Sequence, residues 1–135
     1  MVSNSVSWSF AGKVASSSVT VAEWVILREM YGAGADTSPG AVAELTGLSR
    51  GAVSKLIDRL LKKGLVTRST ASSDRRYQEI KLTAKGASLV PKLAALADEN
   101  DREFFGVLTP AERKQLMLLL KKTARIHRLT KAPIE

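Results

Sequence analysis

The chain has 135 residues, of which 44% are hydrophobic and 25% charged, as is usual for one soluble globular domain. Its 21 Lys and Arg against 13 Asp and Glu give a formal net charge of +8, which favours a polyanionic partner, nucleic acid first and an anionic membrane surface second. The lack of cysteine excludes disulfides and thiolate metal sites, and the single histidine, His127, excludes a histidine-cluster zinc site. We expect no metal and no cofactor.

Residues 1–19 are rich in serine and contain Trp8 and Phe10. They lack the basic segment and the continuous apolar run of a signal peptide, and no later stretch reaches the length of a membrane span. We therefore expect a cytoplasmic protein. The first clear helix signal follows this stretch, because Thr20 and Glu23 have the spacing of a capping box. The apolar residues after it predict a helix that ends by Gly32.

A glycine turn separates two further predicted helices. Ser38 is a helix cap followed by proline, which predicts a short helix over 39–46 with Val42 and Leu45 facing inward. Gly47 turns the chain. Ser49 can then cap a helix over 49–63, in which apolar residues recur at spacings of three and four: Val53, Leu56, Ile57, Leu60 and Leu61.

A hairpin is predicted after this helix, since residues 65–68 and 77–82 suit strands and the polar segment STASSDRR lies between them. Two leucine-rich helices are expected next. The first, over 84–104, begins after the cap Thr83 and contains Pro91, which predicts a bend. The second, over 109–129, begins with a capping box and a proline, LTPAE.

The short helix, the turn, the second helix and the hairpin together predict a winged helix-turn-helix, a mainly α fold with a small β-hairpin wing (α+β). The apolar face of the second helix is committed to the core, so its opposite face is left with short and basic side chains suited to a major groove. Alone, such a face could simply be solvated; with the turn and the hairpin it indicates DNA. The candidate DNA-binding residues here are Ser38, Ser49, Arg50, Gly51, Ser54, Lys55 and Arg59.

Adjacent arginines at the hairpin tip repel one another and bury nothing, so their placement suggests an anionic partner. A wing beside a recognition helix reaches the neighbouring minor groove, where an inserted arginine is favoured. Arg75 and Arg76 are therefore candidate DNA contacts, and Asp74 would orient a guanidinium. The charge distribution agrees, since ten Lys and Arg oppose three Asp and Glu between Ser49 and Gly86.

The segments AELTGLSRGAVSKLIDRLLKKGLVTR and SSDRRYQEIKLTAKG resemble the MarR family of bacterial transcription regulators, most closely over 42–86. The wing motif of that family, Asp-x-Arg, falls on Asp74 and Arg76. The resemblance implies a homodimer formed by N- and C-terminal helices, which binds pseudo-palindromic promoter DNA as a repressor. Many members release DNA on binding a small, often phenolic, ligand, so a small-molecule effector is also implied, with Trp24 and Arg28 as candidate ligand contacts.

The resemblance is weakest before Thr20, where we expect only a short serine-rich arm in place of the substantial first helix of the family. The domain would then comprise an arm and first core helix (1–34), a winged helix-turn-helix (35–86) and dimerisation helices (87–135). The alternative function is a winged-helix module whose basic face docks an acidic protein. An enzyme is not expected, because serines without a histidine partner and scattered carboxylates do not make an active site.

Overall fold

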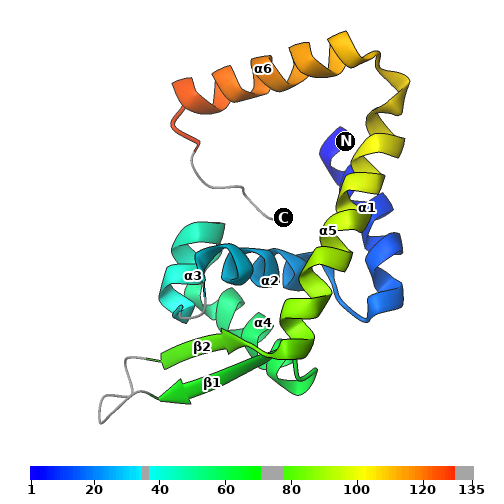
Figure 1. Cartoon of the computed structure of the whole chain (residues 1–135). Coiled ribbons are helices and arrows are strands. Elements are labelled where there is room, and N and C mark those ends of the chain that lie inside the picture. Colours follow the sequence, from blue (N-terminus) through cyan, green and yellow to red (C-terminus); the bar gives the residue numbers. More distant parts are fainter. Residues whose placement is uncertain (35–36, 71–77, 130–135) are drawn as a thin grey trace.

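The computed structural model describes residues 1–34, 37–70 and 78–129. Its elements in chain order are α1 (Val2–Val14), η1 (Ala15–Ser17), α2 (Val21–Ala33), α3 (Pro39–Thr46), α4 (Arg50–Lys62), β1 (Val66–Thr70), β2 (Gln78–Leu82), α5 (Ala84–Phe104), η2 (Phe105–Val107) and α6 (Pro110–Ile126). The fold is therefore mainly helical with one antiparallel hairpin, which confirms the predicted winged helix-turn-helix. Figure 1 shows α2, α3, α4 and the hairpin gathered around the lower half of the long helix α5.

The core lies between these elements, and α2, α4, β2 and α5 contribute its largest fully buried side chains, which include Ile26, Leu27, Ile57, Leu60, Ile80 and Leu93. The two strands pair in antiparallel register from Val66 opposite Leu82 to Thr70 opposite Gln78. A single bridge adds Thr37 beside Ile80, with the Ile80 N–H donating to the Thr37 carbonyl over 2.8 Å. The wing is thus hydrogen-bonded to the segment that leads into α3.

Side-chain caps start five of the helices where the sequence predicts them. The hydroxyls of Ser38, Ser49, Thr83 and Thr109 each accept a backbone hydrogen bond from the residue three positions later, and α2 begins with the predicted Thr20 capping box. Such caps satisfy backbone N–H groups that have no partner within the helix. They explain why local sequence locates these starts well.

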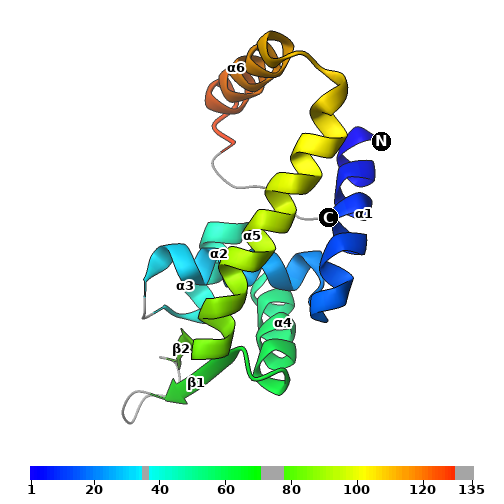
Figure 2. The same cartoon turned by 45° about the vertical axis from the view of Figure 1, so that its right-hand side comes forward.

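The expectation of a short N-terminal arm is wrong, because residues 2–14 form the helix α1. Figure 2 shows α1 beside the upper half of α5. Asn100 of α5 is buried, accepts a 2.6 Å hydrogen bond from Ser9 and donates to the Val6 carbonyl. Phe10 is buried as well. α1 has no capping side chain, so these contacts with α5, rather than a local signal, stabilise it.

The prediction that Leu45 of α3 faces inward is also wrong, because this side chain is 47% exposed. Val42 of the same helix is buried as predicted, and Ala43 is buried as well. A helix of eight residues has room for only one narrow buried stripe, and Leu45 lies beside that stripe.

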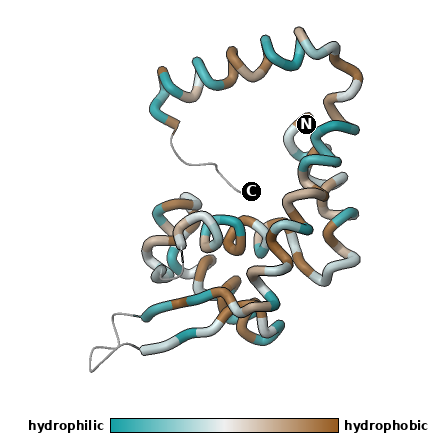
Figure 3. Tube along the Cα trace, in the orientation of Figure 1, coloured by the Kyte–Doolittle hydropathy of each residue, from teal (hydrophilic) through white to brown (hydrophobic). Residues whose placement is uncertain are grey.

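α6 extends from the end of α5, across an elbow at η2, and packs sparsely on the other described elements (Figures 1 and 2). Hydrophobic residues recur along it in Figure 3, and most of its large apolar side chains are exposed. Among the described residues, no helix combines the length and the apolar character needed to cross a membrane.

Candidate nucleic-acid interface

The turn between α3 and α4 fixes the angle at which α4 leaves the core. Gly47 has a left-handed backbone conformation (φ 76°), and its N–H donates to the Ala43 carbonyl over 2.9 Å, which closes α3. Thr46, which is buried, donates its hydroxyl to the Val42 carbonyl and accepts the Leu48 N–H. Sequence analysis missed this role of Thr46; the only signal for it was a β-branched polar residue next to the turn glycine.

α4 presents one apolar and one polar face. Val53, Leu56, Ile57 and Leu60 are buried, as their spacing predicts. The opposite side is exposed and carries the predicted candidates Arg50, Gly51, Ser54, Lys55 and Arg59. The α4 face formed by these five residues is called the basic face below.

The acidic residue beside the basic face is neutralised within the protein. Arg68 of β1 donates to Asp58 of α4 over 2.9 Å, and this ion pair also joins the wing to the helix. Among the described residues, Arg50, Lys55 and Arg59 form no such pair with a carboxylate. The charge of the basic face is therefore directed outward, where it can attract an anion.

Comparison with known proteins agrees with this geometry. A model of the MarR family matches residues 17–76, the segment from the α1–α2 connection to the wing. The chain is 27% identical to MarR from E. coli without ligand, with a TM-score of 0.79 and coverage of 91% of both chains. The chain therefore resembles the MarR family.

Two further MarR-family structures have a known ligand or partner. A mutant of E. coli MarR in complex with operator DNA is 27% identical, with a TM-score of 0.80 over 91% of this chain and 88% of that one. BpsR from Bordetella bronchiseptica, whose DNA binding is regulated by 6-hydroxynicotinic acid, is 28% identical, with a TM-score of 0.77 over 91% and 87% of the two chains. MarR-family proteins are transcription regulators, which agrees with the expectation that this chain is not an enzyme.

Two of the predicted DNA contacts, Ser38 and Ser49, are also helix caps. Ser38 and Ser49 each accept a backbone N–H at 3.2 Å, from Ala41 and Ala52. A serine hydroxyl that accepts one hydrogen bond still has its own hydrogen to donate. Both hydroxyls can therefore cap a helix and donate to a phosphate oxygen at the same time. The wing candidates Asp74, Arg75 and Arg76 lie outside the described residues.

The two candidate ligand contacts on α2, Trp24 and Arg28, differ in burial. Trp24 is only 5% exposed, and its ring meets the Phe10 ring edge to face with the centroids 6.2 Å apart. Arg28 is exposed and pairs with the neighbouring Glu29 at 3.0 Å. Trp24 is thus part of the core between α1 and α2, while Arg28 lies on the surface.

Proposed function

We propose that the chain is a homodimeric repressor that binds a pseudo-palindromic promoter site. The basic face of α4 carries this proposal, because its cations lack a carboxylate partner among the described residues and its small residues allow close approach to base edges. Each protomer would place α4 in a major groove and Arg76 in the adjacent minor groove, with half-sites about one helical turn apart. The protein would act in the cytoplasm.

The homodimer is supported by α6 and its elbow with α5. Five consecutive residues of α6, 116–120, are apolar, so the helix is hydrophobic on several sides, and such helices are normally buried. Four of these side chains are more than half exposed in the protomer. Three residues of this run, Leu116, Met117 and Leu120, line a pocket of about 250 Å³ together with Phe105. A second copy of the chain would bury this surface, together with parts of α1 and α5.

A small-molecule effector is the third part of the proposal. It is supported by BpsR, which 6-hydroxynicotinic acid regulates. Arg28 is accessible to a ligand on the surface of α2, whereas the buried Trp24 could only line a ligand site after a movement of Phe10. A phenolic ligand would meet both requirements of such a site, an aromatic contact and a cation.

Selection from a random double-stranded DNA library at moderate salt tests the function directly. Recovery of a two-fold symmetric motif with half-sites one turn apart is the expected result. Affinity for that motif should also fall steeply as salt rises, because the protein displaces counterions from several phosphates. Recovery of no motif would contradict the proposal and favour the other candidate, in which the basic face docks an acidic protein.

A further inference from the structure

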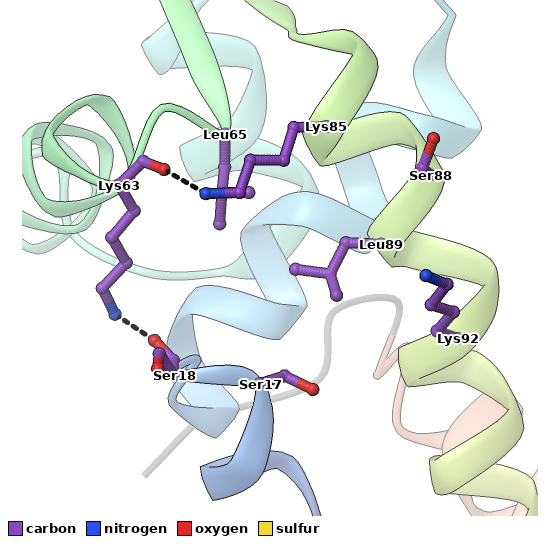
Figure 4. A pocket seen from close by; sticks show the side chains of 8 residues that line it. All are labelled: Ser17, Ser18, Lys63, Leu65, Lys85, Ser88, Leu89 and Lys92. Atoms are coloured by element: carbon purple, nitrogen blue, oxygen red, sulfur yellow. Dashed lines mark hydrogen bonds between the residues drawn. The ribbon is translucent and has the colours of Figure 1, made fainter.

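The residue that follows α4 reaches two segments that lie far from it in the sequence. The ammonium of Lys63 donates to the Ser18 carbonyl and to the Glu23 carboxylate, each over 2.6 Å. Ser18 lies in the connection between α1 and α2, and Glu23 lies in the first turn of α2. Figure 4 shows the Lys63 side chain extending from the end of α4 to Ser18. One side chain therefore joins the helix that carries the basic face to the junction of α1 with α2.

The main chain at the same point is held by the start of α5. Lys85 donates to the Lys63 carbonyl over 3.2 Å, as Figure 4 also shows, and Thr83 donates its hydroxyl to the Gly64 carbonyl over 2.7 Å. Gly64 has a left-handed backbone conformation (φ 70°), which ends α4 and turns the chain toward β1. Because the backbone is fixed on this side and the ammonium is bound on the other, Lys63 has little freedom to move.

Ser18 has a strained backbone at the other end of this link. Its φ of 57° and ψ of 29° place it in the left-handed region, which is unfavourable for a residue with a side chain. Its N–H donates to the Ala15 carbonyl over 3.0 Å, and its carbonyl accepts the hydrogen bond from Lys63. A hydrogen bond from a charged donor is stronger than one between neutral groups. Lys63 therefore stabilises the backbone conformation that sets the direction of α1 relative to α2.

The angle between α1 and α4 determines how far apart a dimer would hold its two basic faces. α1 is attached to the upper half of α5 by Asn100, which contacts Ser9 and the Val6 carbonyl (Figure 2). In the proposed homodimer these helices belong to the interface, whereas α4 contacts DNA. Two-fold symmetry applies any change of this angle to both protomers, so the displacement of one basic face from the other is doubled. Successive base pairs are about 3.4 Å apart, so a shift of about 1.7 Å in each protomer would change the half-site spacing by one base pair.

We propose that Lys63 is a positioning residue for DNA recognition, which holds α4 at a fixed angle to α1 and thereby sets the half-site spacing that the dimer accepts. This role rests on the proposed function, since it needs a dimer on a two-fold symmetric site. Lys63 acts without contacting DNA, because it lies at the opposite end of α4 from Arg50 and its ammonium is bound within the protein. Within the described part of the chain, no side chain of α4 itself makes a hydrogen bond to α2 or to the α1–α2 connection, so the link depends on this lysine.

The test compares DNA sites that differ only in the spacing of their half-sites. Two-fold symmetric sites with one or two base pairs added or removed at the centre are compared by fluorescence anisotropy with the selected site and with an isolated half-site. The unaltered protein should prefer one spacing, since it contacts both half-sites at once only where the geometry allows it. In Lys63→Met, which keeps the apolar stem and removes the ammonium, affinity for the preferred spacing should fall about tenfold and approach that for the other spacings. Affinity for the isolated half-site should stay within about twofold, because the basic face is distant from the substitution.

Three further variants separate positioning from charge and from stability. Lys62→Met removes the same charge from the neighbouring exposed lysine and should keep the spacing preference. Lys63→Arg should keep it as well, because a guanidinium has enough donors for both acceptors. The double variant Lys63→Met, Glu23→Gln leaves no unpaired carboxylate in the core, so it should regain part of the stability that Lys63→Met loses. The Ser18 carbonyl still lacks its donor in the double variant, so the spacing preference should remain lost.

Two results would overturn the positioning role of Lys63. The first is an unchanged spacing preference in Lys63→Met and in the double variant, which would make this lysine a purely structural residue. The second is an equal loss of affinity for the isolated half-site and for the full site, which would mean that Lys63 supports or forms the DNA contact itself. Failure of the proposed function gives a different result, because the unaltered protein would then recover no motif or bind sites of every spacing alike, and the positioning role would fall with it.

Discussion

Lys63 and Glu23 form an ion pair that joins the end of α4 to the start of α2. The ammonium lies 2.6 Å from a carboxylate oxygen of Glu23, whose side chain is 1% exposed, while that of Lys63 is 34% exposed. The same carboxylate accepts the Thr20 N–H of the α2 capping box. The carboxylate therefore fixes the first turn of α2 and, through Lys63, the far end of the helix that carries the basic face.

Lys63→Met should lower the free energy of unfolding by about 2 kcal/mol. Breaking a fully buried pair costs more, but water can reach this site through the exposed part of Lys63. Urea unfolding followed by circular dichroism measures the change. The double variant with Glu23→Gln should recover part of the loss, because the neutral amide needs no ammonium and still accepts the Thr20 N–H. Strictly additive losses would show that the two side chains are not coupled.

Gly86 lies against the backbone of Leu65 at the base of the wing. A side chain at Gly86 would overlap the Leu65 carbonyl, which is backbone and cannot rotate away. Gly86→Ala should therefore separate α5 from the wing and lower the free energy of unfolding by about 3 kcal/mol. Chemical denaturation measures this loss.

Gly12→Ala is the matched control for this substitution. Gly12 lies in α1, and a side chain there would meet no atom within 4 Å. This variant should gain about 0.5 to 1 kcal/mol, as an exposed helical glycine usually does when it is replaced by alanine. Equal losses in both variants would mean that Gly86 is not closely packed.

Sequence reasoning located the elements whose signals are local. Ser49 and the spacing from Val53 to Leu60 fix α4 and its basic face without reference to the rest of the chain. The capping boxes did the same for the starts of α2 and α6. These signals depend on neighbours three or four residues away, so they can be recognised in the sequence without knowledge of the tertiary packing.

The features that it missed depend on distant residues. α1 is stabilised by Asn100, which is 91 residues from its partner Ser9. The bridge between Thr37 and Ile80, and the pair between Lys63 and Glu23, likewise join segments that only the fold brings together. No periodicity or cap in the sequence indicates such contacts, and a buried asparagine in a helix looks the same as an exposed one.

The basic face and the wing arginine should differ in what they contribute to DNA binding. Arg50→Ala and Lys55→Ala should change base preference at particular positions, each by roughly 1 to 3 kcal/mol for a lost base contact. Arg76→Ala should weaken all sites alike, because a minor-groove arginine responds mainly to groove width and potential. Fluorescence anisotropy with the selected site and with single-base variants of it separates the two effects.

Lys122→Ala is the control for loss of one positive charge, since this lysine lies on α6 rather than on the basic face. Its affinity for the selected site should change little, and its preference among bases not at all. If Arg76→Ala bound every site as tightly as the unaltered protein at moderate salt, the assignment of the wing arginine would be wrong.

The capping box at the start of α6 should make this helix end sensitive to acid. Hydrogen bonds with the Thr109 side chain and then with its backbone N–H lower the pKa of Glu112 below the usual glutamate value. The stabilisation is therefore present above the pKa of the unfolded chain and is lost as the pH falls through the lowered folded value. Titration of the Glu112 carboxyl by NMR should show this depressed pKa.

Two threonine variants test the cause of that shift. Thr109→Ala should return the pKa of Glu112 toward the usual value, while Thr123→Ala, on the same helix, should leave it depressed. An unchanged pKa in Thr109→Ala would assign the shift to something other than the capping box.

The apolar surface of α6 should hold two protomers together. Leu119 and Leu120 are 55% and 58% exposed in the protomer, so replacing either with glutamate removes no intrachain core. In a dimer, the same change would place a charge in a buried interface, which we expect to weaken association at least tenfold for each leucine. Sedimentation should then show monomers at concentrations where the unaltered protein is dimeric, with the helical content of the protomer retained.

Gln115→Glu adds the same charge at an exposed polar position of α6, and it should leave the dimer intact. The comparison also separates assembly from DNA contact, because none of these residues lies on the basic face. If Leu120→Glu dissociates the dimer, its affinity for a symmetric site should drop far more than its affinity for a single half-site, since only the dimer contacts both half-sites at once. Equal losses on both kinds of site would contradict a dimer that depends on α6.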